Sequence, residues 1–347
     1  MNARFDVVAV GNALVDVIGS VEEGFLAAHG IVKGSMSLVD EPRSAALYSA
    51  IPEVIETSGG SAANTAYGVA SLGGRAAFIG KVADDSFGRA FALDLHRVGV
   101  EFLPVPVGLD ESTGRCIIAV TPDGQRSMST YLGAAAMLTP GDVDAATAGA
   151  GEVLFLEGYL FDRPEAKEAF RVAAAAAHAA GRRVALTLSD SFCVERHRDD
   201  FLAMVRDEVD VLFSNESELL SLYRQDDFSA AVSLLRDDCE FAAITRDHRG
   251  SVVVDADRLV TIAPVPVDHV VDATGAGDLY AAGFLVGVVR GLDVEECGRL
   301  GSIAASEAIS HMGPRPVMPL RDLVPAELRA AVRGMDGFSR DAHGGSP

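Results

Sequence analysis

Short apolar runs alternate along the chain with longer segments of helical periodicity. The apolar runs lie at Phe5–Val10, Ala76–Gly80, Val153–Glu157, Arg183–Leu188, Val209–Phe213 and Phe241–Thr245. The helical patterns cover Ser61–Leu72, Gly88–Val98, Pro164–Ala180, Ser217–Tyr223 and Asp227–Arg236. Strands that alternate with helices of this length form parallel βαβ units, and strands buried on both faces are continuously apolar. The pattern therefore predicts an α/β fold: a doubly wound, mostly parallel sheet with helices on both faces.

Two segments interrupt this alternation, at about residues 13–40 and 100–132. They contain strand-like pieces without a helical pattern between them. In the second segment, Arg115–Val120 and Arg126–Leu132 flank a Pro-Asp-Gly turn at 122–124, which is typical of a hairpin. We expect these segments to form a small β-sheet, inserted in the α/β core of a single domain over residues 1–330, that acts as a lid. Residues 334–347 are rich in Gly, Ser, Asp and Arg and are expected to be a disordered tail.

Composition and charge narrow the range of partners. The chain has 347 residues, of which 49% are hydrophobic, so it can bury a sizeable core. Its net charge of −21 disfavours nucleic acid and anionic membranes as partners, since both attract clustered Lys and Arg. It has no continuous apolar run of membrane-spanning length, and its four cysteines show neither paired nor zinc-like spacing. We expect a soluble cytoplasmic protein with reduced thiols.

The segment with the most chemical information is Asp272-Ala273-Thr274-Gly275-Ala276-Gly277-Asp278, which precedes a strongly apolar helical run. The backbone N–H groups of Gly275, Ala276 and Gly277 would lie at the positive end of this helix and form an anion hole. Asp278, in the first turn, could accept a proton from a hydroxyl group that attacks a phosphoryl group. A helix-capping Asp after a Gly turn is the alternative, which the neighbouring Asp272 and Thr274 disfavour.

Other nucleotide-binding loops are missing. The chain has no Gly-x-x-x-x-Gly-Lys loop, and no Gly-x-Gly-x-x-Gly follows the first apolar run. P-loop kinases and Rossmann dehydrogenases are therefore disfavoured.

The loop at 272–278 and two further motifs together resemble the signatures of the ribokinase-like (PfkB) kinases. The resemblance covers about residues 5–320. Ser58-Gly59-Gly60-Ser61-Ala62-Ala63-Asn64 resembles the N-terminal glycine block of that family, and Asn215-Glu216-Ser217-Glu218 resembles its Asn-x-x-Glu motif. The resemblance implies a ribokinase-like fold, with ATP and Mg²⁺ as cofactors. It also implies that Asp278 is the catalytic base and that Gly275, Ala276 and Gly277 form the anion hole.

The resemblance extends to the donor site. Asn215 is implied to contact ATP and Glu218 to organise Mg²⁺ through water, although the two could also be a helix-capping pair. Thr245 and Gly250 lie in a segment that resembles the family's ATP-site turn, and Thr274 is implied to contact ATP as well. A monovalent cation binds near the positions of Asp272 and Gly313 in many members of the family.

Within the family, Gly11–Asp16 resembles the opening of nucleoside kinases of the adenosine kinase type. Physically, Asp16 could accept hydrogen bonds from two vicinal hydroxyl groups of a ribose. Arg126 would reach the transferring phosphate from the lid, or else be a solvated hairpin residue. The residues implied at the acceptor site are Asn12, Asp16, Gly59, Gly60, Asn64, Arg126 and Leu132.

These observations predict an ATP-dependent kinase that acts on the 5′-hydroxyl of a ribonucleoside, with adenosine as the first candidate and purine salvage as the context. An apolar slot for the base could come from Leu14, Met36, Tyr131, Leu132 and Tyr159. The alternative is a sugar kinase of the same family, for ribose, fructose or a keto-deoxy sugar acid. A nucleoside sensor without catalysis and a scaffold that pairs through the small sheet are further alternatives. The pattern leaves monomer and homodimer open.

Overall fold

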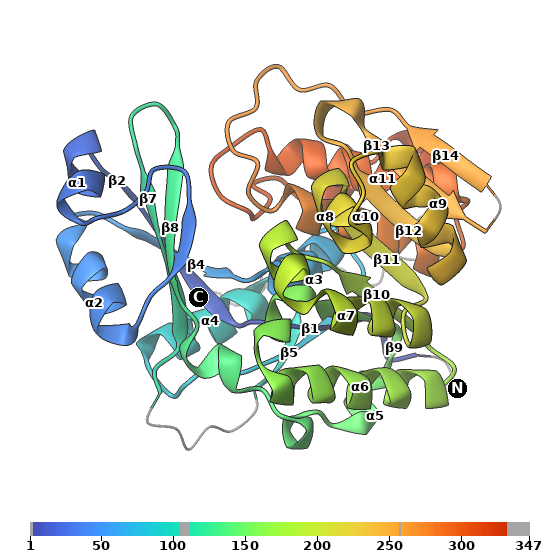
Figure 1. Ribbon diagram of the computed structural model, residues 1–347, viewed down its shortest axis with the longest axis horizontal. Coiled ribbons are helices and arrows are strands. Elements are labelled where there is room, and N and C mark those ends of the chain that lie inside the picture. The colour runs from blue at the N-terminus through green and yellow to red at the C-terminus, as the bar shows by residue number, and fades with distance from the viewer. Residues whose placement is uncertain (1–2, 105–110, 257, 332–347) are drawn as a thin grey trace, which may run out of the picture.

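A large nine-stranded sheet with helices on both faces forms the body of the molecule, and a smaller five-stranded sheet projects from it (Figure 1). The computed structural model describes residues 3–104, 111–256 and 258–331. The large sheet has the order β14-β13-β12-β11-β10-β9-β1-β5-β6, which is parallel except at β13 and β14. Its strands are β1 (Phe5–Val10), β5 (Ala76–Gly80), β6 (Glu101–Pro104), β9 (Gly151–Glu157), β10 (Arg183–Thr187), β11 (Val211–Asn215), β12 (Phe241–Thr245), β13 (Ser251–Asp255) and β14 (Arg258–Ile262). The predicted α/β fold is confirmed.

Helices cover both faces of this sheet, as the continuous apolar strands require. In β1, Val7 and Ala9 pack on one side and Val8 and Val10 on the other, and all four are fully buried. The first face is covered by α3 (Ser61–Ser71), α4 (Ser86–Arg97), α10 (Ala276–Val289) and α11 (Val294–Ala308). The second is covered by α5 (Ala145–Ala148), α6 (Pro164–Ala179), α7 (Ser191–Asp207), α8 (Glu216–Tyr223) and α9 (Phe228–Asp238). The short helices α12 (Leu320–Leu323) and α13 (Ala326–Ala331) follow α11. Within the described ranges, no helix is both long and apolar enough to span a bilayer.

One face of the small sheet is covered by two short helices, and the other face is directed toward the body of the molecule. Its strands, in the order β3-β8-β7-β2-β4, are β2 (Leu14–Ser20), β3 (Met36–Leu38), β4 (Ile55–Gly59), β7 (Gly114–Val120) and β8 (Arg126–Tyr131). The helices α1 (Glu23–Ala28) and α2 (Glu41–Ala50) accompany it (Figure 1). Val15, Val17 and Ile117 share a core cluster with Leu47 of α2. Because side chains alternate along a strand, Asp16, which lies between Val15 and Val17, points the opposite way.

The bounds of the small sheet differ from the predicted ones. The predicted hairpin is present as β7 and β8, but the segment 13–40 contains the short helix α1. Strand β4 joins the small sheet although it lies outside both predicted segments, and β6 joins the large sheet although it lies inside the second. Such membership depends on pairing with distant strands, which a local pattern does not encode. Residues 105–110 of the predicted lid and the predicted tail 334–347 lie outside the described residues.

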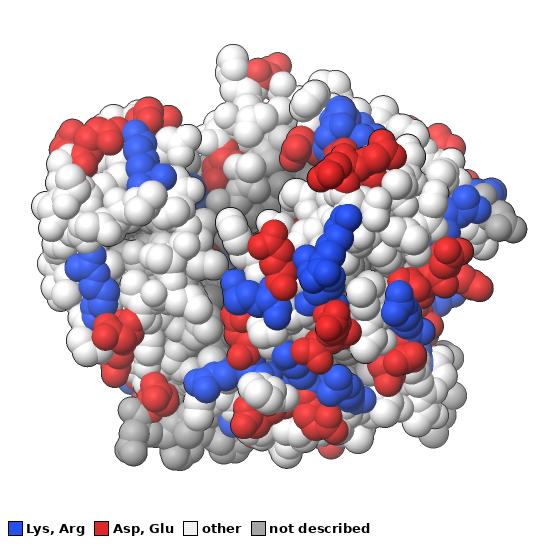
Figure 2. Space-filling view, in the orientation of Figure 1, with Lys and Arg blue, Asp and Glu red and all other residues white. Residues whose placement is uncertain are grey.

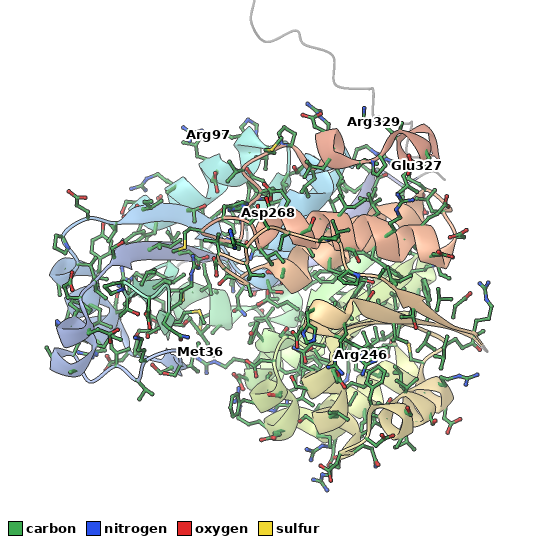
Figure 3. All side chains as sticks on the ribbon, turned by 90° about the horizontal axis from the view of Figure 1, so that it is seen from above. Met36, Arg97, Arg246, Asp268, Glu327 and Arg329 are labelled. Carbon is green, nitrogen blue, oxygen red and sulfur yellow. The ribbon has the colours of Figure 1, made fainter. Side chains whose placement is uncertain are left out.

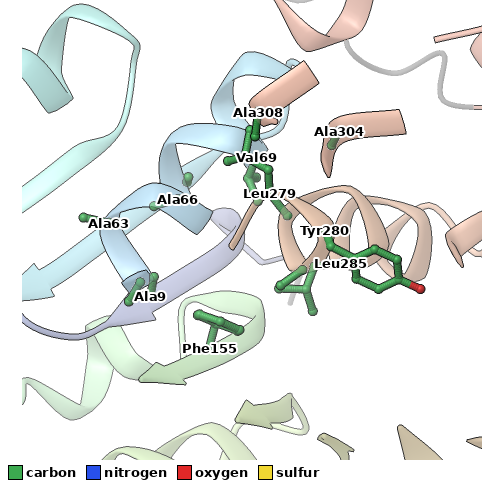
Figure 4. Packing of buried hydrophobic residues seen from close by; sticks show 14 of the residues in the cluster. Ala9, Ala63, Ala66, Val69, Phe155, Leu279, Tyr280, Leu285, Ala304 and Ala308 are labelled. Atoms are coloured by element: carbon green, nitrogen blue, oxygen red, sulfur yellow. The ribbon is translucent and has the colours of Figure 1, made fainter. Parts of the chain in front are cut away.

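Helix α10 forms the centre of the core. It is apolar all round, which is typical of a helix without a solvent face. Gly68 of α3 allows close contact with α10, because a Cβ atom there would lie 2.6 Å from the Cβ of Ala282. Figure 4 shows Val69 of α3 beside Leu279 of α10, and Ala63 and Ala66 of α3 belong to the same core cluster. This contact fixes where the first turns of the two helices lie.

Truncation of the core aromatic residue Phe284 tests this packing. Phe284 is completely buried, and its ring meets the ring of Phe213 edge-on at 5.5 Å. We expect Phe284→Ala to lower the free energy of unfolding by about 3–5 kcal/mol in denaturant titration. The matched control is Phe192→Ala, at a side chain that is 71% exposed, where we expect a change within about 0.5 kcal/mol. Equal losses in the two variants would contradict this description of the core.

Candidate active site

The candidate residues gather at the carboxyl edge of the large sheet, on the side from which the small sheet projects. Asn12 follows β1, Glu157 ends β9, and Asn215 and Thr245 end β11 and β12. This edge is where open α/β sheets bind ligands. The space-filling view shows the surface hollowed between the small sheet and the rest of the molecule (Figure 2). On the same face, acidic and basic side chains are interspersed over the body of the molecule.

The Gly-rich loop leads directly into α10, as the sequence predicts. Gly275 is the N-cap residue, with φ +77°, a conformation that favours glycine. The N–H group of Ala276 donates to the carbonyl oxygen of Ala273 at 3.2 Å, so it belongs to the turn rather than to an open anion hole. The first N–H groups of a helix have no partner within the helix, and Gly277 faces open space, since a Cβ atom there would meet nothing within 4 Å. Gly277 is thus the residue of the predicted hole best placed to approach a ligand.

The carboxylate of Asp278 is held by the first turn of α3. Its two oxygens accept hydrogen bonds from Ser61 Oγ at 2.6 Å and Asn64 Nδ2 at 2.8 Å. The backbone carbonyl of Asp278 also accepts from Thr65 Oγ1 at 3.2 Å. Burial raises the pKa of Asp278, while these two hydrogen bonds and the charge of Arg315 oppose the rise. The carboxylate is therefore fixed in orientation and partly desolvated, as a general base requires.

Glu157 is a member of the site that the sequence analysis missed. This carboxylate is 1% exposed and accepts from Asn12 Nδ2 at 2.7 Å, from the N–H group of Asn12 at 3.3 Å and from that of Ala62 at 2.8 Å. Burial raises the pKa of Glu157 to about 7. The available signal was an acidic residue at the carboxyl end of an apolar strand. Glu157 orients Asn12 and ties it to the start of α3.

Two buried acceptor atoms at the site lack a partner among the described residues. They are Asn12 Oδ1 and Asn64 Oδ1, and their residues are 2% and 5% exposed. Buried polar atoms are nearly always hydrogen-bonded in proteins, and an amide oxygen can be satisfied only by a donor. A ligand with hydroxyl groups would supply such donors.

Asp16 faces the same region from the small sheet. Its side chain lies over the backbone of Gly59, where a Cβ atom would come within 2.5 Å of the carboxylate oxygens. Burial raises the pKa of Asp16 to about 7, against the lowering effect of Arg315 and Arg126. No described residue donates a hydrogen bond to this carboxylate. The predicted Asn12, Asp16, Gly59, Gly60 and Asn64 are thus brought together around Asp278.

Arg126 ties the small sheet to the Gly-rich loop. Its guanidinium lies 2.6 Å from Asp272 Oδ2 and donates to Thr274 Oγ1 at 3.2 Å, and both charged side chains are less than a tenth exposed. Asp272 also accepts from Thr274 Oγ1 at 2.8 Å and from the N–H group of Gly313 at 2.8 Å. Arg126 is therefore not a solvated hairpin residue. Arg126 lies beside the Gly-rich loop, and its contact with a phosphate stays a prediction.

The residues predicted at the ATP site have structural roles in their own segments. Asn215 and Glu218 form a reciprocal capping box at the start of α8: Glu218 N–H donates to Asn215 Oδ1 at 2.8 Å, and Asn215 N–H donates to Glu218 Oε2 at 2.9 Å. Burial raises the pKa of Glu218 to about 7, with further increase from Asp190 and Asp278. Thr245 Oγ1 donates to the carbonyl of Ser214 at 3.5 Å, and Gly250 has φ +79°. Their roles toward ATP and Mg²⁺ stay predictions.

Of the residues suggested for the apolar slot, Met36 lies on the face of the small sheet that carries Asp16, but Tyr131 does not. Tyr131 donates to Glu111 at 2.6 Å and its ring lies 5.7 Å from the Arg115 guanidinium, on the face of the small sheet opposite Asp16. Leu132 is half-buried before a 3₁₀ turn at Gly133–Met137. On the face of Asp16, cross-strand pairing instead forms an apolar row of Met36, Met128, Ile118, Ile18 and Ile55. Figure 3 shows Met36 on the small sheet and Arg246 on the body of the molecule.

Comparison with known proteins identifies the family of the chain. A sequence model of the pfkB family of carbohydrate kinases matches residues 6–321. The chain is similar to the crystal structure of adenosine kinase from Sinorhizobium meliloti, with 49% identity, a TM-score of 0.86 and coverage of 92% of this chain and 98% of that one. It is also similar to the structure of a probable sugar kinase from Rhizobium etli, with 44% identity, a TM-score of 0.87 and coverage of 95% and 99%. Adenosine kinase from Saccharomyces cerevisiae is 28% identical over 331 residues, which cover 88% of this chain and 95% of the relative. The family resemblance is confirmed.

The two glycines of the loop should respond differently to the same substitution. In Gly275→Ala, the new Cβ would lie 2.6 Å from the Cβ of Pro314 at a positive φ, so we expect the free energy of unfolding to fall by roughly 1–3 kcal/mol. Gly277→Ala adds a methyl group in open space at a helical position, so stability should be kept. Thermal unfolding and ATP titration of both variants measure the difference. We expect Gly277→Ala to bind ATP at least about tenfold more weakly. Unchanged ATP binding by that variant would remove Gly277 from the anion hole.

Proposed function

Because this chain belongs to the pfkB family of carbohydrate kinases, ATP-dependent enzymes that phosphorylate nucleosides or sugars, we propose that it phosphorylates the 5′-hydroxyl of a ribonucleoside. Adenosine is the first candidate. The observation that carries the proposal is the set of unsatisfied acceptors around Asp278, namely the carboxylate of Asp16 and the amide oxygens of Asn12 and Asn64. Two vicinal ribose hydroxyls supply matching donors. The relatives named as adenosine kinases support the same choice.

The chemistry follows from how each side chain is held. The ribose hydroxyls would donate to Asp16 and Asn12, which leaves the 5′-hydroxyl at Asp278. Ser61 and Asn64 donate to the Asp278 carboxylate, so they keep it ionised and aimed at that proton. Asp278 takes the proton as the hydroxyl oxygen attacks the γ-phosphorus, and the bond to the bridging β-phosphate oxygen breaks to release ADP. The N–H groups that begin α10 stabilise the phosphoryl oxygens. The small sheet, tied by Arg126, would keep water out.

The donor side fits ATP with Mg²⁺. Among the described residues, no group of three or more His, Cys, Asp or Glu side chains could hold a metal ion. Mg²⁺ keeps several waters and is bound mainly through substrate phosphates, so one carboxylate of the protein can serve it. When bound, Mg²⁺ neutralises charge on the phosphates. We propose that Asn215, Thr245, Gly250 and Thr274 contact ATP, and that Glu218 orients the waters of the ion. A monovalent cation near Asp272 and Gly313 stays a prediction, as do cytoplasmic location and the choice between monomer and homodimer.

The second candidate is a sugar kinase of the same family. The relative from Rhizobium etli is named a probable sugar kinase, and both classes share the acceptor hydroxyls that Asp16 and Asn12 would recognise. A free sugar would leave the apolar row of the small sheet without a partner. The row, with Met36 at one end and Ile55 at the other, therefore favours an acceptor that carries a flat apolar group.

An acceptor panel tests the proposal directly. ADP formation with MgATP is measured for adenosine, inosine, guanosine, cytidine, ribose and fructose at equal concentration. We expect turnover with one or more nucleosides and little with free sugars. Turnover with sugars alone would reject the nucleoside proposal in favour of the second candidate.

Replacement of the proposed base tests the mechanism. In Asp278→Asn, the amide cannot accept the proton, so kcat should fall by at least about 10² while nucleoside binding stays nearly unchanged. Asp84→Asn, at a side chain that is 92% exposed, is the matched control and should keep wild-type kcat. Initial rates and calorimetric binding give the two quantities. Near-wild-type turnover by Asp278→Asn would exclude Asp278 as the base.

A further inference from the structure

The segment Gly313-Pro314-Arg315 runs between the two loops that carry the proposed chemistry. Its first two residues contact the phosphate loop, defined here as residues 272–278. The N–H group of Gly313 donates to Asp272 Oδ2 at 2.8 Å. Pro314 packs on Gly275 so closely that a Cβ atom on the glycine would lie 2.6 Å from its own Cβ. The backbone of the segment is therefore attached to the phosphate loop.

Arg315 reaches from this segment to the acceptor loop, defined here as residues 58–64. Its guanidinium donates from Nε to the carbonyl of Ser58 at 3.0 Å, from Nη1 to the carbonyl of Ala63 at 2.9 Å and from Nη2 to Ser58 Oγ at 2.8 Å. The guanidinium also lies 4.5 Å from the centre of the Tyr67 ring. Three donors in a rigid fork thus hold both ends of the turn that contains Gly59 and Gly60.

The surroundings keep Arg315 in this position. It stands between Pro314 and Pro316, and a residue that precedes proline is restricted to extended conformations. On the other side of the acceptor loop, Asp94 accepts from the N–H group of Ser58 at 3.2 Å and from its hydroxyl. Ser58 is therefore fixed from two directions, which makes the fork of Arg315 a rigid link.

We propose that Arg315 is a positioning residue that sets the acceptor loop against the phosphate loop, so that the acceptor hydroxyl lies in line between Asp278 and the transferring phosphate. The inference rests on the proposed phosphoryl transfer at Asp278. The link matters because Ser61 and Asn64, which orient the Asp278 carboxylate, belong to the loop that Arg315 holds. A displacement of about 1 Å between reacting groups can lower a rate 10²-fold.

The charge of Arg315 gives the link a measurable signature. It lowers the pKa of Asp278, whose other partners are the uncharged Ser61 and Asn64. It also lowers the pKa of Asp16, together with Arg126 and against Asp278 and Asp272. The remaining carboxylates that respond to the charge of Asp278 are Glu157 and Glu218. Loss of this cation should raise the pKa of both Asp278 and Asp16, so the fall of kcat/KM on the acid side should begin at higher pH.

Two substitutions separate geometry from charge. Arg315→Met removes the fork and the cation, so we expect kcat to fall about 10–100-fold and the acid limb of kcat/KM to move up by roughly 0.5–1 pH unit. Arg315→Lys keeps the cation but cannot reach three acceptors, so kcat should fall while the acid limb stays in place. Both are measured with whichever acceptor the wild type turns over. Arg299→Met, at a side chain of α11 that is 49% exposed, is the matched control and should leave both quantities unchanged.

The outcomes decide between this role and a merely structural one. Wild-type kcat and an unmoved acid limb in Arg315→Met would overturn the proposal. So would a loss of activity that only follows the loss of folded protein, with a normal pH profile in what remains. If Arg315→Met does not fold, Arg315→Lys decides, and wild-type kcat in that variant overturns the positioning role. A wild type without turnover on any acceptor would instead refute the proposed function, and this role with it.

Discussion

A carboxylate that is partly removed from water must be hydrogen-bonded, and the structure around Asp278 is arranged to meet this requirement. Asp278 lies in the first turn of one buried helix, α10, and its partners Ser61 and Asn64 lie in the first turn of another, α3. The two helices pack against each other in the core, and Gly68 of α3 allows close contact with Ala282 of α10. The packing of two apolar helices thus determines the geometry of a polar site at their ends. Displacement of either helix would leave a desolvated carboxylate without its donors.

The site contains more acidic groups than basic ones, and burial is the main influence on their pKa values. Asp16, Glu157 and Glu218 each have a pKa raised to about 7 by burial. At Asp16, the cations that oppose this rise in pKa are Arg126, from the small sheet, and Arg315, from the segment after α11. At Glu157 and Glu218, hydrogen bonds oppose it instead. Each arginine is also a mechanical link, the first to the phosphate loop and the second to the acceptor loop. Charge compensation and loop placement therefore depend on the same two side chains.

How much of this could be predicted from the sequence depends on the range of the interactions. The strand and helix alternation and the loop ending in Asp278 are local patterns, so the fold and the position of Asp278 followed from them. The partners of Glu157 and Arg315 were not predictable in this way, because Asn12 lies 145 residues from Glu157 and Ser58 lies 257 residues from Arg315. The predicted bounds of the small sheet were wrong for the same reason, since the sheet that β4 and β6 join depends on pairing with strands elsewhere in the sequence. The capping pair of Asn215 and Glu218 is local, and the sequence offered it as an alternative.

In the proposed complex, Asp16 and Asn12 hold the ribose while Asp278 faces its 5′-hydroxyl. The most direct test is the position of the phosphate on the product made from adenosine, read by phosphorus–proton coupling in NMR spectra. We expect phosphorus coupled to the two 5′-methylene protons of the ribose. Phosphorus coupled to the 2′ or 3′ proton would contradict it, because the ribose would then lie reversed between Asp16 and Asp278. Inorganic phosphate as the sole product would contradict it as well, because Asp278 would then activate water instead of the nucleoside.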